Sequence, residues 1–111
     1  MRLPITAWTS IAHRASGVFL FAAAGVLIWM LDASLASPQS FASLQEALAS
    51  PLFKLVIWAV AAGLIYHSAA GVRHLIMDMG IGETMEGGTR GAQIVIALSV
   101  LLTILAGVWI W

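Results

Sequence analysis

Residues 55–72 read LVIWAVAAGLIYHSAAGV, a continuous apolar run without one charged side chain. A helix needs about 20 mostly apolar residues to cross roughly 30 Å of hydrocarbon. With its flanking residues, the run therefore predicts a membrane-spanning helix over 52–79. Apolar residues fill both faces instead of alternating with polar ones, and this excludes the strand of a membrane β-barrel.

Two other segments have the same character. Residues 15–31 carry no charge, and residues 91–111 contain no ionisable side chain. With their flanks they predict spans over 8–35 and 90–111. The whole chain is therefore expected to be a single all-α membrane domain with three transmembrane helices.

The connecting segments also have recognisable signals. Pro38 follows the first span closely and ends it. A short interfacial helix is expected over 41–49, where Ser43 and Glu46 have the spacing of a capping box. The glycine-rich residues 80–88 predict a polar loop before the third span.

The composition agrees with a lipid environment. The chain has 111 residues, of which 61% are hydrophobic and 9% charged, whereas about a quarter of a soluble domain is charged. A domain this small buries only about 60–70% of its unfolded surface, so a water-soluble monomer is excluded. The formal net charge of zero offers no basic field for nucleic acid. The absence of cysteine excludes disulfides, thiolate metal sites, c-type haem attachment and iron–sulfur ligation by this chain.

The positive residues predict the orientation. Lys54 lies on one side of the three-span arrangement and four arginines lie on the other. These are Arg2, Arg14, Arg73 and Arg90. The positive-inside rule then places the N-terminus in the cytoplasm and the C-terminus outside. The alternative is a cleaved signal peptide over 1–37, which would leave Arg14 in a long n-region and Pro38 close behind the cut.

His67 is the most deeply placed ionisable residue of the three spans. At 100° per residue it shares a helix face with small residues and one further histidine. These are Ala59, Gly63, Ala70, Gly71 and His74. Such a face would let a flat macrocycle approach the backbone while His67 Nε2 binds its iron. The alternative is close helix packing, with His67 hydrogen-bonded to a neighbouring helix.

A second axial ligand for such an iron is not expected from this chain. His74 lies two turns from His67 on the same helix, roughly 10 Å along its axis, so the two cannot bind opposite faces of one macrocycle. His13 is expected near the cytoplasmic end of its helix, too shallow to face His67. The sequence therefore predicts a partner subunit that supplies the other ligand.

A polar face opens the first span. Ser10, His13, Arg14 and Gly17 follow one another at helical spacing. Arg14 could neutralise a haem propionate or donate to a quinone carbonyl, and Ser10 could donate to a quinone oxygen. Alternatively, Arg14 extends to lipid phosphate and sets the topology, while Ser10 caps the helix.

The other two spans carry weaker signals. Arg73, His74 and Asp78 end the second span, where His74 and Asp78 could relay protons near a quinone. The alternative there is a solvated, mutually neutralising helix end. In the third span a stripe of small residues, Ser99, Thr103 and Gly107, predicts helix packing, and Trp109 and Trp111 predict an interfacial anchor.

Two compound motifs resemble one known family. Residues 10–17, SIAHRASG, and residues 67–80, HSAAGVRHLIMDMG, are similar to signatures of the cytochrome b subunit of succinate dehydrogenase, which is part of respiratory complex II. The motifs occur in the family's order and at its three-span spacing. The family usually carries a cytoplasmic stretch before its first helix, whereas Pro4 follows almost at once here, so contacts of that stretch are not carried over.

The resemblance implies a site for each motif. His67 matches the axial ligand of haem b, opposite a histidine of a second small anchor subunit. Ser10 and Arg14 match quinone-binding residues, and His13 and Arg14 lie where haem propionates are met. Asp78 matches a carboxylate near that region.

The resemblance also implies partners and a location. A flavoprotein subunit with FAD oxidises succinate, and an iron–sulfur subunit passes the electrons to ubiquinone, linking the tricarboxylic acid cycle to electron transport. The chain would be a multi-pass protein of the bacterial inner membrane, with its C-terminus in the periplasm, in a helix bundle with the second anchor. It performs no succinate chemistry itself. Two alternatives are a haem-free structural anchor and a small transporter or channel subunit.

Overall fold

The computed structural model describes residues 5–81 and 84–111, and these residues form four α-helices and no strand. The helices are α1 (Ile5–Ala36), α2 (Pro38–Leu48), α3 (Pro51–Asp78) and α4 (Met85–Ile110). In the described residues, α1, α3 and α4 are long and apolar enough to cross a membrane. The predicted all-α membrane fold with three spans is therefore confirmed.

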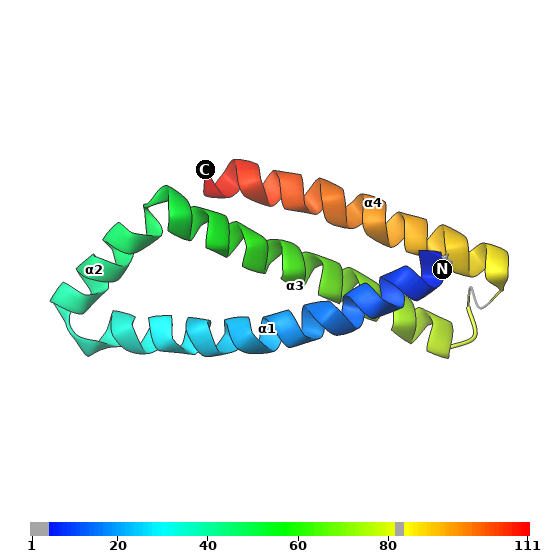
Figure 1. Cartoon of the computed structure of the whole chain (residues 1–111), viewed down its shortest axis with the longest axis horizontal. Helices are drawn as coiled ribbons and strands as arrows, with labels where there is room; N and C mark the ends of the chain where they lie inside the picture. Colours follow the sequence, from blue (N-terminus) through cyan, green and yellow to red (C-terminus); the bar gives the residue numbers. More distant parts are fainter. Residues whose placement is uncertain (1–4, 82–83) are drawn as a thin grey trace.

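The three long helices run along the longest dimension of a molecule that measures 56 × 28 × 24 Å (Figure 1). α3 contacts both α1 and α4 and is the central helix. The start of α1, the end of α3 and the start of α4 lie at one end of the molecule, and α2 joins α1 to α3 at the other. Three of the arginines predicted to be cytoplasmic, Arg14, Arg73 and Arg90, thus lie toward the same end of the molecule. Arg2 lies outside the described residues.

The start of α2 corrects the predicted interfacial helix. The helix begins at Pro38 rather than near residue 41, and Ser43 is an interior residue, so the capping box expected there is wrong. Ser37 is the N-cap, and its Oγ accepts a hydrogen bond from the Ser40 backbone N–H at 2.9 Å. Pro38 suits the first turn because a proline has no N–H to leave unpaired there.

The loop between α3 and α4 is shorter than predicted. α3 ends in a Schellman motif: Gly80 has a φ of +86°, and the Ile81 N–H donates to the Ile76 carbonyl oxygen. α4 already begins at Met85, because the Thr84 Oγ1 accepts from the Gly87 N–H at 3.0 Å. Residues 85–88, expected in a polar loop, are therefore helical.

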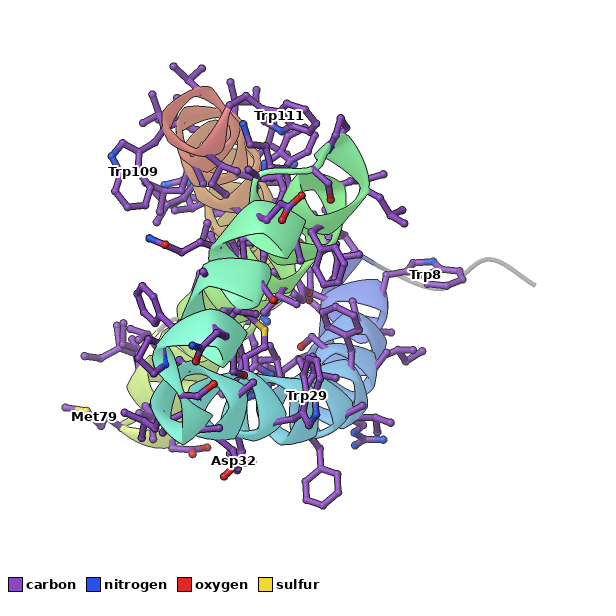
Figure 2. All side chains as sticks on the ribbon, turned by 90° about the vertical axis from the view of Figure 1, so that its left-hand side faces the viewer. Trp8, Trp29, Asp32, Met79, Trp109 and Trp111 are labelled. Atoms are coloured by element: carbon purple, nitrogen blue, oxygen red, sulfur yellow. The ribbon has the colours of Figure 1, made fainter. Side chains whose placement is uncertain are left out.

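Few apolar side chains are buried within this chain. Among the described residues the buried apolar set is small, and none of the large side chains is completely enclosed. Its members are Ala23, Ala70, Ala92 and Val95. Trp8 and Trp109 point away from the helices (Figure 2), and Trp29 is also exposed. The apolar helix surfaces therefore face lipid or other subunits rather than a core of this chain.

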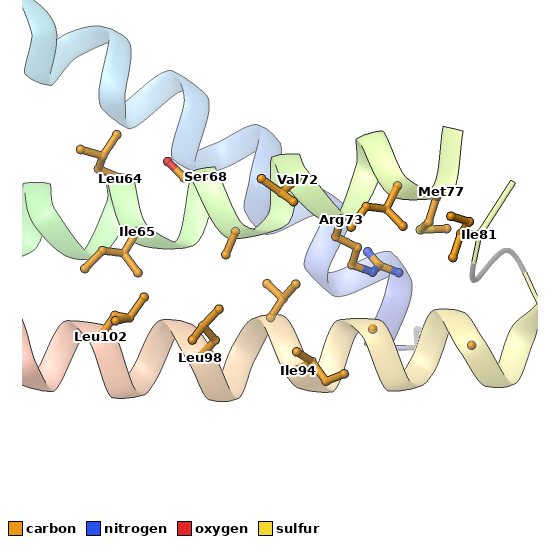
Figure 3. Close-up of a pocket in the computed structure, with 15 residues that line it drawn as sticks. Leu64, Ile65, Ser68, Val72, Arg73, Met77, Ile81, Ile94, Leu98 and Leu102 are labelled. Atoms are coloured by element: carbon orange, nitrogen blue, oxygen red, sulfur yellow. The ribbon is translucent and has the colours of Figure 1, made fainter. Parts of the chain in front are cut away.

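The predicted packing stripe on α4 joins it to α3. Trp58 Nε1 donates to the Thr103 carbonyl oxygen at 2.7 Å. A Cβ at Gly107 would lie 2.9 Å from two atoms of the Trp58 ring, so only glycine admits the indole here. Toward the other end, an apolar groove of about 710 Å³ runs between α3 and α4, with Arg73 among its lining residues (Figure 3).

Candidate functional site

His67 meets α1 where that helix presents two small residues in succession. The His67 Nδ1 lies 2.8 Å from the Ser16 Oγ, and the Ser16 hydroxyl also donates to the His13 carbonyl oxygen at 2.7 Å. A Cβ at Gly17 would lie 3.3 Å from the His67 Cε1. In residues 5–81 and 84–111, the His67 Nε2 has no hydrogen-bond partner.

His13 lies directly against His67. The two rings stack with centroids 4.3 Å apart and an interplanar angle of 7°, and His74 is tilted against His13 with centroids 5.2 Å apart. The prediction that His13 is too shallow to face His67 is wrong. α1 begins at Ile5, so His13 is about 12 Å along it, and His67 is about 16 Å from the end of α3.

The stacking geometry nevertheless separates His13 from the role of a second axial ligand to the same iron. Stacked rings place their faces together, whereas two axial ligands point nitrogen atoms at each other through the metal. Stacking covers one face of His67 and leaves its edge, which carries Nε2, unaffected. Within the part of the chain that the structure describes, no group of three or more His, Cys, Asp or Glu residues could hold a metal ion.

Part of the small-residue face of α3 packs against α1. A Cβ at Gly63 would lie 2.8 Å from Phe19 Cε2, and a Cβ at Gly71 would lie 3.5 Å from His13 Nε2. The packing interpretation thus describes these two glycines in this chain. The same contacts hold the His67 backbone close to α1, which is what allows its ring to reach Ser16.

The predicted quinone-binding residues lie beside this contact. His13 and Gly17 of the polar face touch α3, while Ser10 is half-buried and Arg14 exposed. Among the described residues, neither Ser10 nor Arg14 has a side-chain hydrogen bond or ion pair with another residue. These two side chains are therefore available to a ligand or to another subunit.

Arg73 does not fit the alternative interpretation of a solvated helix end. Its side chain is 7% exposed. Nη1 donates to the Thr9 Oγ1 at 3.4 Å and Nη2 to the Gly88 carbonyl oxygen at 3.2 Å, which ties α3 to both α1 and α4. Asp78 is exposed, and the described residues contain no ion pair between Asp78 and His74.

Three side chains of this region were not predicted from the sequence as functional. Ser16 contacts His67, Thr9 accepts from Arg73, and the Tyr66 hydroxyl donates to the Thr9 carbonyl oxygen at 2.7 Å. Thr9 and Ser16 lie at helical spacing from His13, one turn before and one turn after it. Their spacing could therefore have indicated from the sequence that they share a helix face with His13. The sequence did not indicate which residues of α3 they contact.

Comparisons with known proteins identify the family. Residues 1–106 match the model of the succinate dehydrogenase/fumarate reductase transmembrane subunit. The chain belongs to this family. It is 38% identical over 109 residues to the succinate dehydrogenase cytochrome b556 subunit of Coxiella burnetii, with 97% of this chain and 87% of that protein covered.

Other family members extend the similarity. The cytochrome b556 subunit of Paracoccus denitrificans is 38% identical over 104 residues, covering 94% of this chain and 80% of that protein. The mitochondrial cytochrome b560 subunit of Sus scrofa is 35% identical over 100 residues, covering 86% of this chain and 57% of that protein. The family assignment from the two motifs is therefore confirmed, and the chain is a membrane subunit of the succinate dehydrogenase class of oxidoreductase complexes.

Haem b, to which the word cytochrome in the relatives' names refers, fits the donor set on α3. His67 has one ring nitrogen beside Ser16 and the other without a partner among the described residues. An imidazole oriented through one nitrogen and open at the other is the usual arrangement of a histidine metal ligand.

Proposed function

We propose that this chain is the haem b-binding anchor of a succinate:ubiquinone oxidoreductase and forms part of its quinone-reduction site. The observation that carries the proposal is His67: an imidazole eleven residues inside a 28-residue apolar helix, held at Nδ1 and without a partner at Nε2 among the residues that the structure describes. An ionisable residue at such depth is costly without a function or a partner. Bound haem b supplies a one-electron carrier.

The residues around His67 have separate tasks in this proposal. His67 would bind the iron through Nε2, and His13 and Arg14 would interact with the propionates. His13 stacks on a face of the His67 ring and so is not placed to bind the same iron as His67. This arrangement supports a further iron ligand from another polypeptide, a histidine of a second small anchor subunit.

Ser10 and Arg14 bind the quinone. Their side chains are one turn apart on α1, where Ser10 is half-buried and Arg14 is exposed. A serine hydroxyl and a guanidinium can both donate to a quinone oxygen. Asp78 and His74 lie at the same end of the molecule, where protons for quinone reduction would enter, and we assign them to a proton relay.

The same end would dock the soluble subunits. In the proposed orientation the starts of α1 and α4 face the bacterial cytoplasm, and the C-terminus faces the periplasm, following the positive-inside rule. A flavoprotein with FAD and an iron–sulfur protein would bind there, so that electrons from succinate reach the quinone near Arg14. This chain contributes no residue to succinate oxidation.

Purification of the complex tests the proposal. A tag on this chain should recover a flavoprotein, an iron–sulfur protein and a second small membrane protein, with a b-type reduced-minus-oxidised spectrum. Arg14→Ala should lower quinone reduction at least tenfold while succinate oxidation with a soluble dye continues. Lys54→Ala is the control for removal of a positive charge, because Lys54 lies near the start of α3, away from the proposed docking end, and should leave both rates unchanged. Unchanged quinone kinetics in Arg14→Ala would contradict the quinone assignment.

A further inference from the structure

The contact between Ser16 and His67 has two possible directions, and each corresponds to one tautomer of the imidazole. A serine hydroxyl has one hydrogen to donate and two lone pairs. When that hydrogen is used in the 2.7 Å bond to the His13 carbonyl oxygen, the Ser16 oxygen accepts from His67, whose Nδ1 lies 2.8 Å away. In that arrangement Nδ1 carries the ring proton, and Nε2 carries the lone pair.

We infer that Ser16 is a positioning residue, which holds His67 in the tautomer and ring orientation that leave Nε2 free to bind iron. The inference rests on the proposed function, because it assigns a role toward the haem. Ser16 does not touch the iron. It acts through His67, as outer-shell partners of metal-bound histidines generally do.

Two other contacts restrict the same ring. Gly17, the residue after Ser16, lets His67 approach the α1 backbone, since a Cβ there would lie 3.3 Å from Cε1 and 3.9 Å from Nδ1. His13 covers one ring face at a centroid distance of 4.3 Å. The ring is thus held at its Nδ1 edge, beside Cε1 and on one face. Nε2 is the polar atom that these three contacts leave open.

Ser34 shows which part of this arrangement is special. It also lies on α1, and its hydroxyl donates to the carbonyl oxygen three residues earlier, Leu31, at 2.7 Å. That bond is a common habit of serine in helices. Ser16 makes the same bond and also has its oxygen within hydrogen-bond distance of a ring nitrogen on another helix. Ser34 is therefore the matched control for Ser16.

The test uses the intact, membrane-extracted complex with Ser16→Ala beside Ser34→Ala. Loss of an outer-shell partner typically lowers metal affinity 10- to 100-fold, so Ser16→Ala should lower the haem-to-flavin ratio on dilution or detergent washing. Retained haem should have a more positive reduction potential, because an imidazole that no longer donates from Nδ1 is a weaker electron donor to ferric iron. A tenfold change in the reduction equilibrium corresponds to about 59 mV for a one-electron couple. Ser34→Ala should change neither quantity.

Further variants keep the test decisive if Ser16→Ala assembles poorly. Ser16→Thr retains the hydroxyl and should retain the wild-type potential. Ser16→Cys has a side chain of similar size, but its sulfur is a weak hydrogen-bond acceptor. The reduction potential of its haem should therefore lie between those of the wild type and Ser16→Ala. Gly17→Ala should change the ferric electron paramagnetic resonance spectrum by turning the ligand ring. Gly25→Ala, whose added Cβ meets nothing within 4 Å, should not.

The outcomes separate the inference from the proposed function. If His67→Ala abolishes the b-type spectrum and Ser16→Ala keeps wild-type haem content and potential, the positioning role is wrong and the proposed function stands. If the wild-type complex contains no haem b, or keeps it in His67→Ala, both are wrong. The inference is supported if the haem reduction potential becomes more positive in Ser16→Ala but not in Ser16→Thr.

Discussion

The contact of α1 with α3 and the contact of α3 with α4 use the same device for different ends. In each, a ring lies against a glycine and makes a hydrogen bond across the helix pair. Trp58 lies against Gly107 and donates to the Thr103 carbonyl oxygen. His67 lies against Gly17 and has its Nδ1 beside the Ser16 hydroxyl.

The difference lies in what each ring has left after the bond is made. An indole has one polar atom, its Nε1–H, so the Trp58 bond satisfies it completely. An imidazole has two ring nitrogens, so the His67 bond fixes one and leaves the other available. One contact can only pack helices, whereas the other packs helices and presents a ligand atom. Changes to the first should affect stability alone, and changes to the second should also affect the haem spectrum.

Arg73→Lys should have the largest effect on stability, because Arg73 joins both contacts. Lysine keeps the buried charge, but its single ammonium nitrogen cannot reach both the Thr9 hydroxyl and the Gly88 carbonyl as the two terminal nitrogens of arginine do. The expected loss is about 1.5–3 kcal/mol, measured as thermal denaturation of the purified complex. Arg90→Lys is the control: it changes an exposed pair with Glu86 at 3.8 Å and should cost less than about 0.5 kcal/mol. Equal effects of the two variants would contradict the joining role of Arg73.

Gly107→Ala should destabilise the complex without changing its haem. The added Cβ would lie 2.9 Å from the Trp58 ring, and overpacking of this kind costs about 1–3 kcal/mol. Assembled complex should have a lower melting temperature and an unchanged reduction potential. A shifted potential would show that the two contacts are coupled through α3.

Trp58→Phe should have the smallest effect. Phenylalanine keeps an aromatic ring beside Gly107 and loses the Nε1 donor to Thr103. Hydrogen bonds between membrane helices average about 0.6 kcal/mol and reach about 1.7 kcal/mol. Denaturation of the complex should show a loss in that range with an unchanged b-type spectrum. A loss of haem in this variant would contradict the claim that the contact of α3 with α4 affects stability alone.

The spans were predictable from the sequence because long uncharged runs have few other structures available to them. The apolar run over residues 55–72 predicted a helix independently of the segments that pack around it. Helix ends depended on single caps. Thr84 begins α4 inside a stretch whose glycines predicted a loop, and Ser37 rather than Ser43 caps α2.

The sequence indicated candidate residues for the site but not their contacts. The rarity of histidine in an apolar run singled out His67. The burial of Arg73 and the contact of Ser16 with His67 depend on how α1 crosses α3, and periodicity within one helix does not contain that information. His13 was misplaced for the same reason, since its depth relative to His67 depends on where two separate helices end.

The difference spectrum of the complex with His67→Ala, beside His74→Ala, tests the central claim most directly. Both variants remove an imidazole from the same helix near His13, and only the first removes the atom assigned to iron. The account predicts that the reduced-minus-oxidised b-type bands disappear in His67→Ala and persist in His74→Ala, with the flavoprotein and iron–sulfur subunits still bound in both. Persistence of the bands in His67→Ala would contradict it.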